Sequence, residues 1–207
     1  MSGSRRFAAL FRLGLVLLLA AGCRSLTLPP PPPGVELRPG QYVGEYFAAP
    51  DFDPAAGRYQ LAPLRVEEGR TTAAAFPRLF QEELSRAFAA NGLTLGLAPA
   101  DYRLSAVIHR VEVSRAFRWW RGRISAHLLF SGTITHKERV VFACRDAVTL
   151  SSPVAPGPAA PREEELLLRQ LARTAAQRLL NQMLLYRFSD PGARSANTLS
   201  TSRGRRS

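Results

Sequence analysis

The residue types that catalyse reactions or bind metals are few in this sequence and lie far apart. There are three histidines, His109, His127 and His136, and two cysteines, Cys23 and Cys144. A zinc site needs three or four convergent ligands, and the sequence has neither an HExxH motif nor paired CxxC motifs. We therefore expect a protein that is not an enzyme and holds no metal or cofactor. A metal-dependent envelope hydrolase is the alternative, and it requires the histidines to converge.

One stretch, RAFRWWRGR, has a composition that favours binding. It holds both tryptophans of the chain and four arginines within nine residues. Arginine grips phosphate with a bidentate fork, and tryptophan favours both membrane headgroups and protein interfaces. Three roles fit this composition: the rings close the core, the segment contacts a membrane or lipid phosphate, or it docks on a protein. The candidate contact residues are Arg115, Phe117, Arg118, Trp119, Trp120, Arg121 and Arg123.

The basic charge of the chain is concentrated at its two ends. The formal net charge is +12, a value that first suggests a nucleic-acid partner. Residues 1–22, however, carry three arginines and no acid, and residues 187–207 carry five arginines against one aspartate. More than half of the excess charge therefore lies outside the middle of the chain, which weakens the case for nucleic acid.

The amino terminus has the order of an export signal. Residues 1–13 are basic, and residues 14–21 form an apolar run shorter than the roughly 20 residues that span a bilayer. The run leads into Leu19-Ala20-Ala21-Gly22-Cys23, which resembles the lipobox of bacterial lipoproteins, with Ala20 where leucine is more usual. The resemblance implies a signal peptide over residues 1–22, cleaved before a lipid-modified Cys23. An ordinary signal peptide with a chance cysteine is the alternative.

The residue after Cys23 bears on location. It is Arg24 rather than aspartate, and by resemblance to Gram-negative lipoproteins this implies the outer membrane, with the protein facing the periplasm. The membrane would then be a partner through the lipid on Cys23, and an envelope protein or lipid would be the second partner. Export also removes nucleic acid as a partner. Cys144 would be left without an intrachain thiol to pair with, so we expect it to be buried.

Composition divides the mature chain into three parts. Residues 23–40 contain five consecutive prolines, Pro29–Pro33, a run that favours an extended polyproline II tether. Residues 41–186 are expected to form a single domain. Residues 187–207 are basic and have few apolar residues, so we expect a disordered tail.

Apolar spacing within residues 41–186 predicts an α+β fold. A strand is expected at residues 59–66, followed by a helix with Phe76, Phe80, Leu84 and Phe88 on one face. Three strands are expected at 102–113, 124–130 and 140–150, with a shift of phase after Ile108 that a bulge would allow. The last helix is expected at 162–186. The order is strand–helix–strand–strand–strand–helix, a mainly antiparallel sheet with two helices packed on one face.

The stretch Phe76–Val113 gives a second resemblance. Its helix FPRLFQEELSRAFAANGL leads into ADYRLSAVIHRVEV, and an Ala-Asp-Tyr-Arg-Leu entry into a strand is similar to that in small periplasmic lipoproteins. The nearest types are the lipopolysaccharide-assembly lipoprotein and the auxiliary lipoproteins of lipid-transport ABC systems. The resemblance implies an accessory role in lipid or lipopolysaccharide transport. A passive structural lipoprotein is the alternative.

Overall fold

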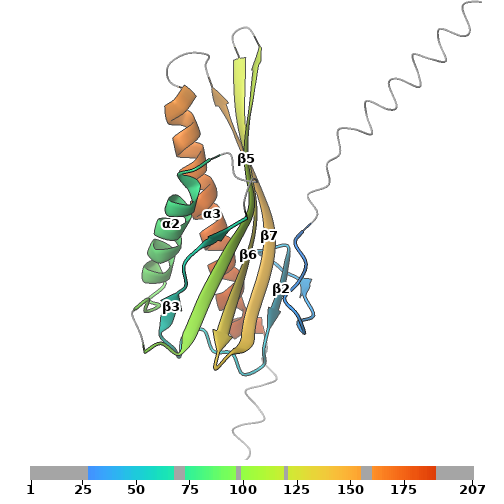
Figure 1. Ribbon diagram of the computed structural model, residues 1–207, viewed down its shortest axis with the longest axis vertical. Coiled ribbons are helices and arrows are strands. Elements are labelled where there is room, and N and C mark those ends of the chain that lie inside the picture. Colours follow the sequence, from blue (N-terminus) through green and yellow to red (C-terminus); the bar gives the residue numbers. More distant parts are fainter. Residues whose placement is uncertain (1–27, 68–72, 97–98, 119–120, 155–159, 190–207) are drawn as a thin grey trace, which may run out of the picture.

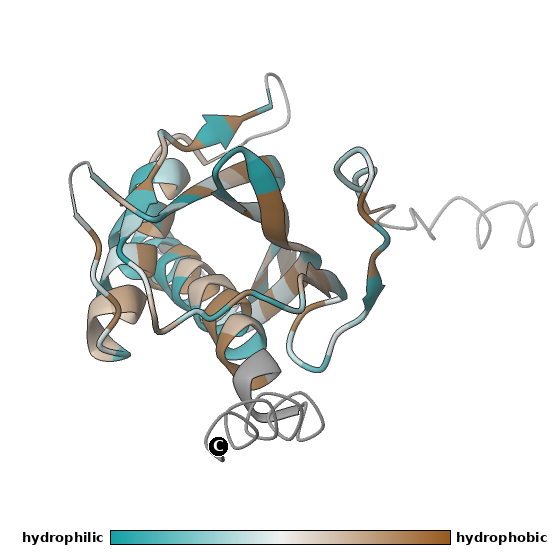
Figure 2. Cartoon of the chain, turned by 90° about the horizontal axis from the view of Figure 1, so that it is seen from below, coloured by the Kyte–Doolittle hydropathy of each residue, from teal (hydrophilic) through white to brown (hydrophobic). Residues whose placement is uncertain are grey.

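The computed structural model describes residues 28–67, 73–96, 99–118, 121–154 and 160–189. Seven strands form one sheet in the order β1-β2-β7-β6-β5-β3, with β4 also paired to β5. Helices α2 and α3 lie on the same side of this sheet, as Figure 1 shows and as Figure 2 shows from below. The expected α+β class, with a mainly antiparallel sheet and helices on one face, is confirmed.

Three long strands form the centre of the sheet. They are β5 (Tyr102–Arg118), β6 (Arg121–His136) and β7 (Arg139–Val154), and each is antiparallel to the next. The register of β5 shifts between Ile108 and Arg110, so the expected bulge is confirmed. Because of it, Leu104, Ile108 and Val111 are all buried on the helix side.

Both helices bury the apolar stripes that their spacing predicts. Helix α2 (Phe76–Ala90) buries Phe76, Phe80, Leu84 and Phe88 and ends at Asn91, before Gly92 in the left-handed region. Helix α3 (Ala160–Ser189) starts two residues earlier and ends three residues later than expected. Its buried residues include Leu168, Leu171, Ala175, Leu179 and Met183. The two helices and the sheet thus share one core.

The first expected strand is divided in two. Residues 59–66 form β3 (Tyr59–Leu61) and β4 (Arg65–Val66), and both run parallel to β5. Pro63 lies between them and has no N–H to donate to a ladder. Helix α2 follows β4 and carries the chain back to the start of β5. This return is what a parallel connection requires.

The segment before the expected domain is folded onto it. Strand β1 (Arg38–Pro39) pairs with β2 (Glu45–Ala48), and β2 pairs with β7. Pro29 is buried, and its carbonyl accepts a hydrogen bond from Arg145. Gly34 has a φ of 73° in a turn between Pro32 and Val35, a value that glycine adopts without strain. Residues 28–40 of the expected tether therefore contact the domain through Pro29 and β1, and residues 23–27 lie outside the described residues.

Candidate functional site: the basic hairpin tip

The RAFRWWRGR segment forms the tip of the β5–β6 hairpin. Pairing runs from Arg103 opposite Thr135 to Arg118 opposite Arg121, so the strands expected at 102–113 and 124–130 both extend into this segment. The tip projects beyond the amino-terminal end of α3 (Figure 1). Trp119 and Trp120 lie outside the described residues, as do the side chains of Arg118 and Arg121.

Phe117 lies on the surface of the tip. It is 48% exposed, and a β-carbon added at Gly122 would meet its ring at 2.6 Å. The ring therefore covers the glycine on the opposite strand, and a larger residue at position 122 would displace it. This position excludes the possibility that Phe117 closes the core.

The two arginines described at the tip have different surroundings. Arg115 donates from Nε to Glu164 at 2.7 Å, which ties the hairpin to the first turns of α3. Arg123 is exposed, and among the described residues no acidic side chain pairs with it. Gly122 lies opposite Phe117 and Arg123 lies opposite Ala116, so the tip presents an aromatic ring on one face of the hairpin and a cation on the other. That combination suits an anionic or mixed polar–apolar partner.

The histidines do not converge. His127 lies opposite Glu112 rather than His109 and bonds Thr149 at 2.9 Å, while His136 bonds the Asp101 carbonyl at 2.7 Å. Among the described residues, no group of three or more histidine, cysteine, aspartate or glutamate side chains has the arrangement of a metal site.

His109 is the centre of a hydrogen-bonded chain that the sequence does not reveal. Its Nδ1 lies 2.5 Å from Glu67 Oε1, and its Nε2 lies 2.8 Å from Ser131 Oγ. The order of groups is that of an acid–histidine–serine triad. Acyl transfer also needs donors aimed at an oxyanion, whereas the strands around Ser131 use their backbone in the β5–β6 and β6–β7 ladders. The contacts tie the end of β4 to β5 and β6.

The structure describes one of the two cysteines, Cys144. Cys144 is a free thiol, 2% exposed, and burial raises its pKa to about 12. The expectation of a buried cysteine is confirmed. Cys23 lies outside the described residues.

A buried polar cluster joins β2, β7 and α3. Asp146 is 2% exposed; its Oδ1 accepts from Gly44 N at 3.0 Å, and its Oδ2 lies 3.1 Å from Arg178 Nε. That Nε donates instead to the Tyr42 carbonyl, and Tyr42 N donates to Gln182 at 2.9 Å. Oδ2 has no hydrogen bond, so it depends on the charge of the guanidinium. Burial raises the pKa of Asp146 and the arginine partly opposes this shift. In the sequence, the one sign of this cluster is an aspartate at a strand position where the alternation predicts an apolar residue that faces the core.

No described helix is long and apolar enough to cross a bilayer.

No family model and no curated protein matches the chain. Solved structures of similar fold include proteins described as lipoproteins. A minor lipoprotein from Acinetobacter baumannii is 14% identical, with 65% of this chain and 96% of that one covered and a TM-score of 0.44. The rare lipoprotein B from Shewanella oneidensis is 19% identical, with coverages of 62% and 96% and a TM-score of 0.39. The PelC dodecamer from Paraburkholderia phytofirmans is 10% identical, with coverages of 69% and 97% and a TM-score of 0.40. At these identities and TM-scores, the likeness assigns neither a family nor a function to this chain.

Proposed function

We propose that this protein is a non-enzymatic, lipid-anchored accessory protein of the bacterial outer membrane that faces the periplasm and binds an envelope partner through its hairpin tip. The observation that carries the proposal is the exposed tip itself, where Phe117 and Arg123 sit outside the core at the end of continuously paired strands. A rigid hairpin holds these side chains in a fixed arrangement, which lowers the entropy lost on binding.

The anchor in this proposal is a lipid on Cys23, supported by the LAAGC sequence before it. Mass spectrometry of the mature chain from a Gram-negative host tests it. The expected mature chain begins at Cys23 and carries acyl chains, and the Cys23→Ser variant is expected to leave the membrane fraction. A mature chain that begins at an unmodified residue other than Cys23 contradicts the anchor.

The tip is tested by removing its described contacts. The full chain carrying Phe117→Ala and Arg123→Ala is compared with Arg103→Ala, an exposed arginine near the opposite end of β5. Flotation with phosphatidylglycerol vesicles and with neutral phosphatidylcholine vesicles measures lipid binding, and co-purification from envelopes measures protein binding. We expect the tip variant to lose one of these interactions and Arg103→Ala to keep it.

A Trp119→Ala/Trp120→Ala variant extends the same comparison to the rest of the tip. Unchanged binding in both tip variants, with folding intact, removes the hairpin from the proposed function. The pathway we propose is lipid or lipopolysaccharide transport. Gene neighbours that encode an ABC transporter or lipopolysaccharide machinery would support it, whereas normal transport in a deletion strain would favour a passive structural role.

A further inference from the structure

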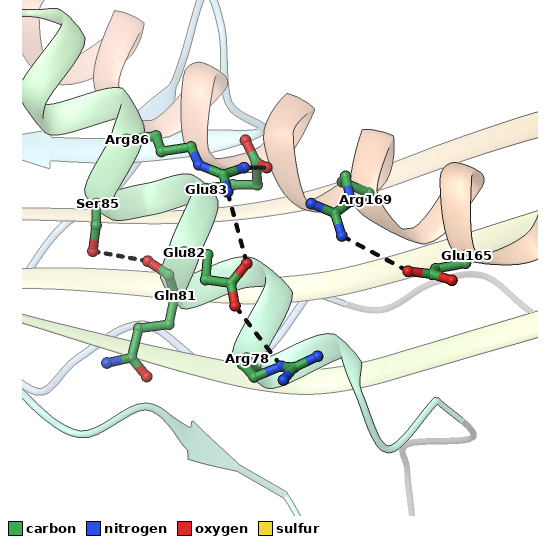
Figure 3. A network of polar contacts seen from close by, with 8 residues as sticks. All are labelled: Arg78, Gln81, Glu82, Glu83, Ser85, Arg86, Glu165 and Arg169. Atoms are coloured by element: carbon green, nitrogen blue, oxygen red, sulfur yellow. Dashed lines mark hydrogen bonds and ion pairs between the residues drawn. The ribbon is translucent and has the colours of Figure 1, made fainter.

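A groove of about 770 Å³ runs between α2 and α3 and plays no part in the function proposed above. Figure 3 shows side chains of the two helices from close by, among them Arg86 of α2 and Arg169 of α3, with the strands of the sheet behind. Its lining includes Arg86 and Ala87 from α2 and Leu166, Arg169, Arg173 and Gln177 from α3.

The shape of the groove suits a rod. The lining residues of α3 extend from Leu166 to Gln177 along one face, a length of about 16 Å at 1.5 Å per residue. Ala87 and Ala90 line the opposite wall, and such small side chains allow another backbone to approach closely. Leu166 is 60% exposed at one end and offers an apolar contact. A third helix would fit this space, as helix-in-groove complexes do.

The charge of the groove is positive. Arg86, Arg169 and Arg173 line it with a single acid, Glu83. Glu83 is 7% exposed and is held by Arg86 at 2.5 Å, so this carboxylate is already neutralised. Arg169 lies 3.7 Å from Glu165 in a largely exposed pair, which holds it weakly. Arg173 is exposed and pairs with no acidic side chain among the described residues. An acidic occupant would supply a carboxylate partner for Arg173 and a closer one for Arg169.

The chain itself does not provide that occupant. Residues 1–27 carry four arginines and no acid, and residues 190–207 carry four arginines against Asp190. A second copy of the mature chain 23–207 carries a net charge of +9, since three arginines of the total of +12 lie in residues 1–22, and it would be repelled. A bilayer surface is flat and meets projections such as the hairpin tip more readily than a groove between helices. We infer that the α2–α3 groove is a docking site for an acidic amphipathic helix of a protein partner.

Site-specific photo-cross-linking in the full chain tests this inference. The probe is p-benzoylphenylalanine placed at Gln170 in the groove and, as a control, at Gln81 on the other side of α2. Cross-linked material from the native host is digested and sequenced. The expected adduct at Gln170 is a helical protein segment with more acidic than basic residues, and Gln81 is expected to give no such adduct.

Charge-matched variants decide whether the arginines are responsible. Arg169→Ala/Arg173→Ala removes two charges from the groove, and Arg78→Ala/Arg162→Ala removes two exposed charges outside it. We expect the first pair to lower the cross-link yield about tenfold and the second less than about twofold, as for loss of central rather than peripheral contacts. Phe117→Ala/Arg123→Ala should leave the yield unchanged, which separates this site from the hairpin tip. A lipid adduct, a basic segment, equal losses in both arginine pairs or no adduct at Gln170 would overturn the inference.

Discussion

Removing the guanidinium of Arg178 would leave the Asp146 carboxylate buried without a countercharge. The Asp146 side chain is 3% exposed, and its Oδ2 has no hydrogen bond to take over from the ion pair. Breaking a buried pair in this way costs about 3–5 kcal/mol. The Arg178 side chain is 35% exposed, so water replaces part of the lost interaction. For Arg178→Met, which keeps most of the apolar stem, we therefore expect the free energy of unfolding at pH 7 to fall by about 2–3 kcal/mol.

The loss should depend on pH with a definite sign. Burial raises the pKa of Asp146 above its usual 3.8, so the folded chain retains a proton where the unfolded chain has lost it. The contribution of this group to stability is then present below about pH 3.8 and is lost as pH rises through the folded-state pKa. The attraction of Arg178 limits that rise. Arg178→Met should raise the folded-state pKa of Asp146 further. The substitution should therefore be more destabilising at pH 7 than at pH 4.

Urea denaturation at pH 4, 5.5 and 7 measures these differences, with Asp146→Asn as the matched control. In the wild-type background Asp146→Asn should destabilise by about 1 kcal/mol, since one charge-assisted contact is lost. In the Arg178→Met background it should stabilise instead, because it removes the uncompensated charge. A difference between wild type and Arg178→Met that is equal at pH 4 and pH 7, or an Asn effect of the same sign in both backgrounds, would refute the reasoning.

Three further results are expected. The thiol of Cys144, with its pKa near 12, should react with iodoacetamide only after unfolding in urea; labelling of Cys144 in the native Cys23→Ser chain would contradict its burial. Gly132→Ala should lower the free energy of unfolding by about 1–3 kcal/mol, because the new β-carbon would lie 2.8 Å from Leu179 Cδ1. Gly96→Ala is the control, since no atom lies within 4 Å of the carbon added there. Both variants are measured in the same urea titrations. Native chain should not be labelled by a fluorophosphonate probe; labelling that Ser131→Ala abolishes would point to an enzyme.

Local periodicity accounts for what the sequence predicted. The change of phase after Ile108 was enough to place a bulge. The four-residue spacing of phenylalanines gave the buried face of α2. Each of these signals lies within a single element or between neighbouring elements, where sequence spacing reports directly on geometry.

Contacts between distant segments could not be predicted in this way. Strand β2 has four residues, too few for a clear alternation, and it pairs with β7 about 100 positions later. The partner of Asp146 lies on α3, and Glu67, His109 and Ser131 come from three different segments. The α2–α3 groove likewise exists only because two helices far apart in sequence pack side by side. The hairpin tip, by contrast, is continuous in sequence, and its composition and its position between two expected strands single it out.

Because Pro29 is buried in the domain, its position limits the length of the linker between the domain and any lipid on Cys23. Only five residues, 24–28, lie between the two positions, and the six steps of a fully extended chain span at most about 22 Å. An anchored domain would therefore stay within one protein radius of the bilayer, with its β1–β2 edge held towards the headgroups. With such a short linker, the anchored domain would diffuse laterally within a thin layer at the membrane. It would meet only partners that reach the membrane surface.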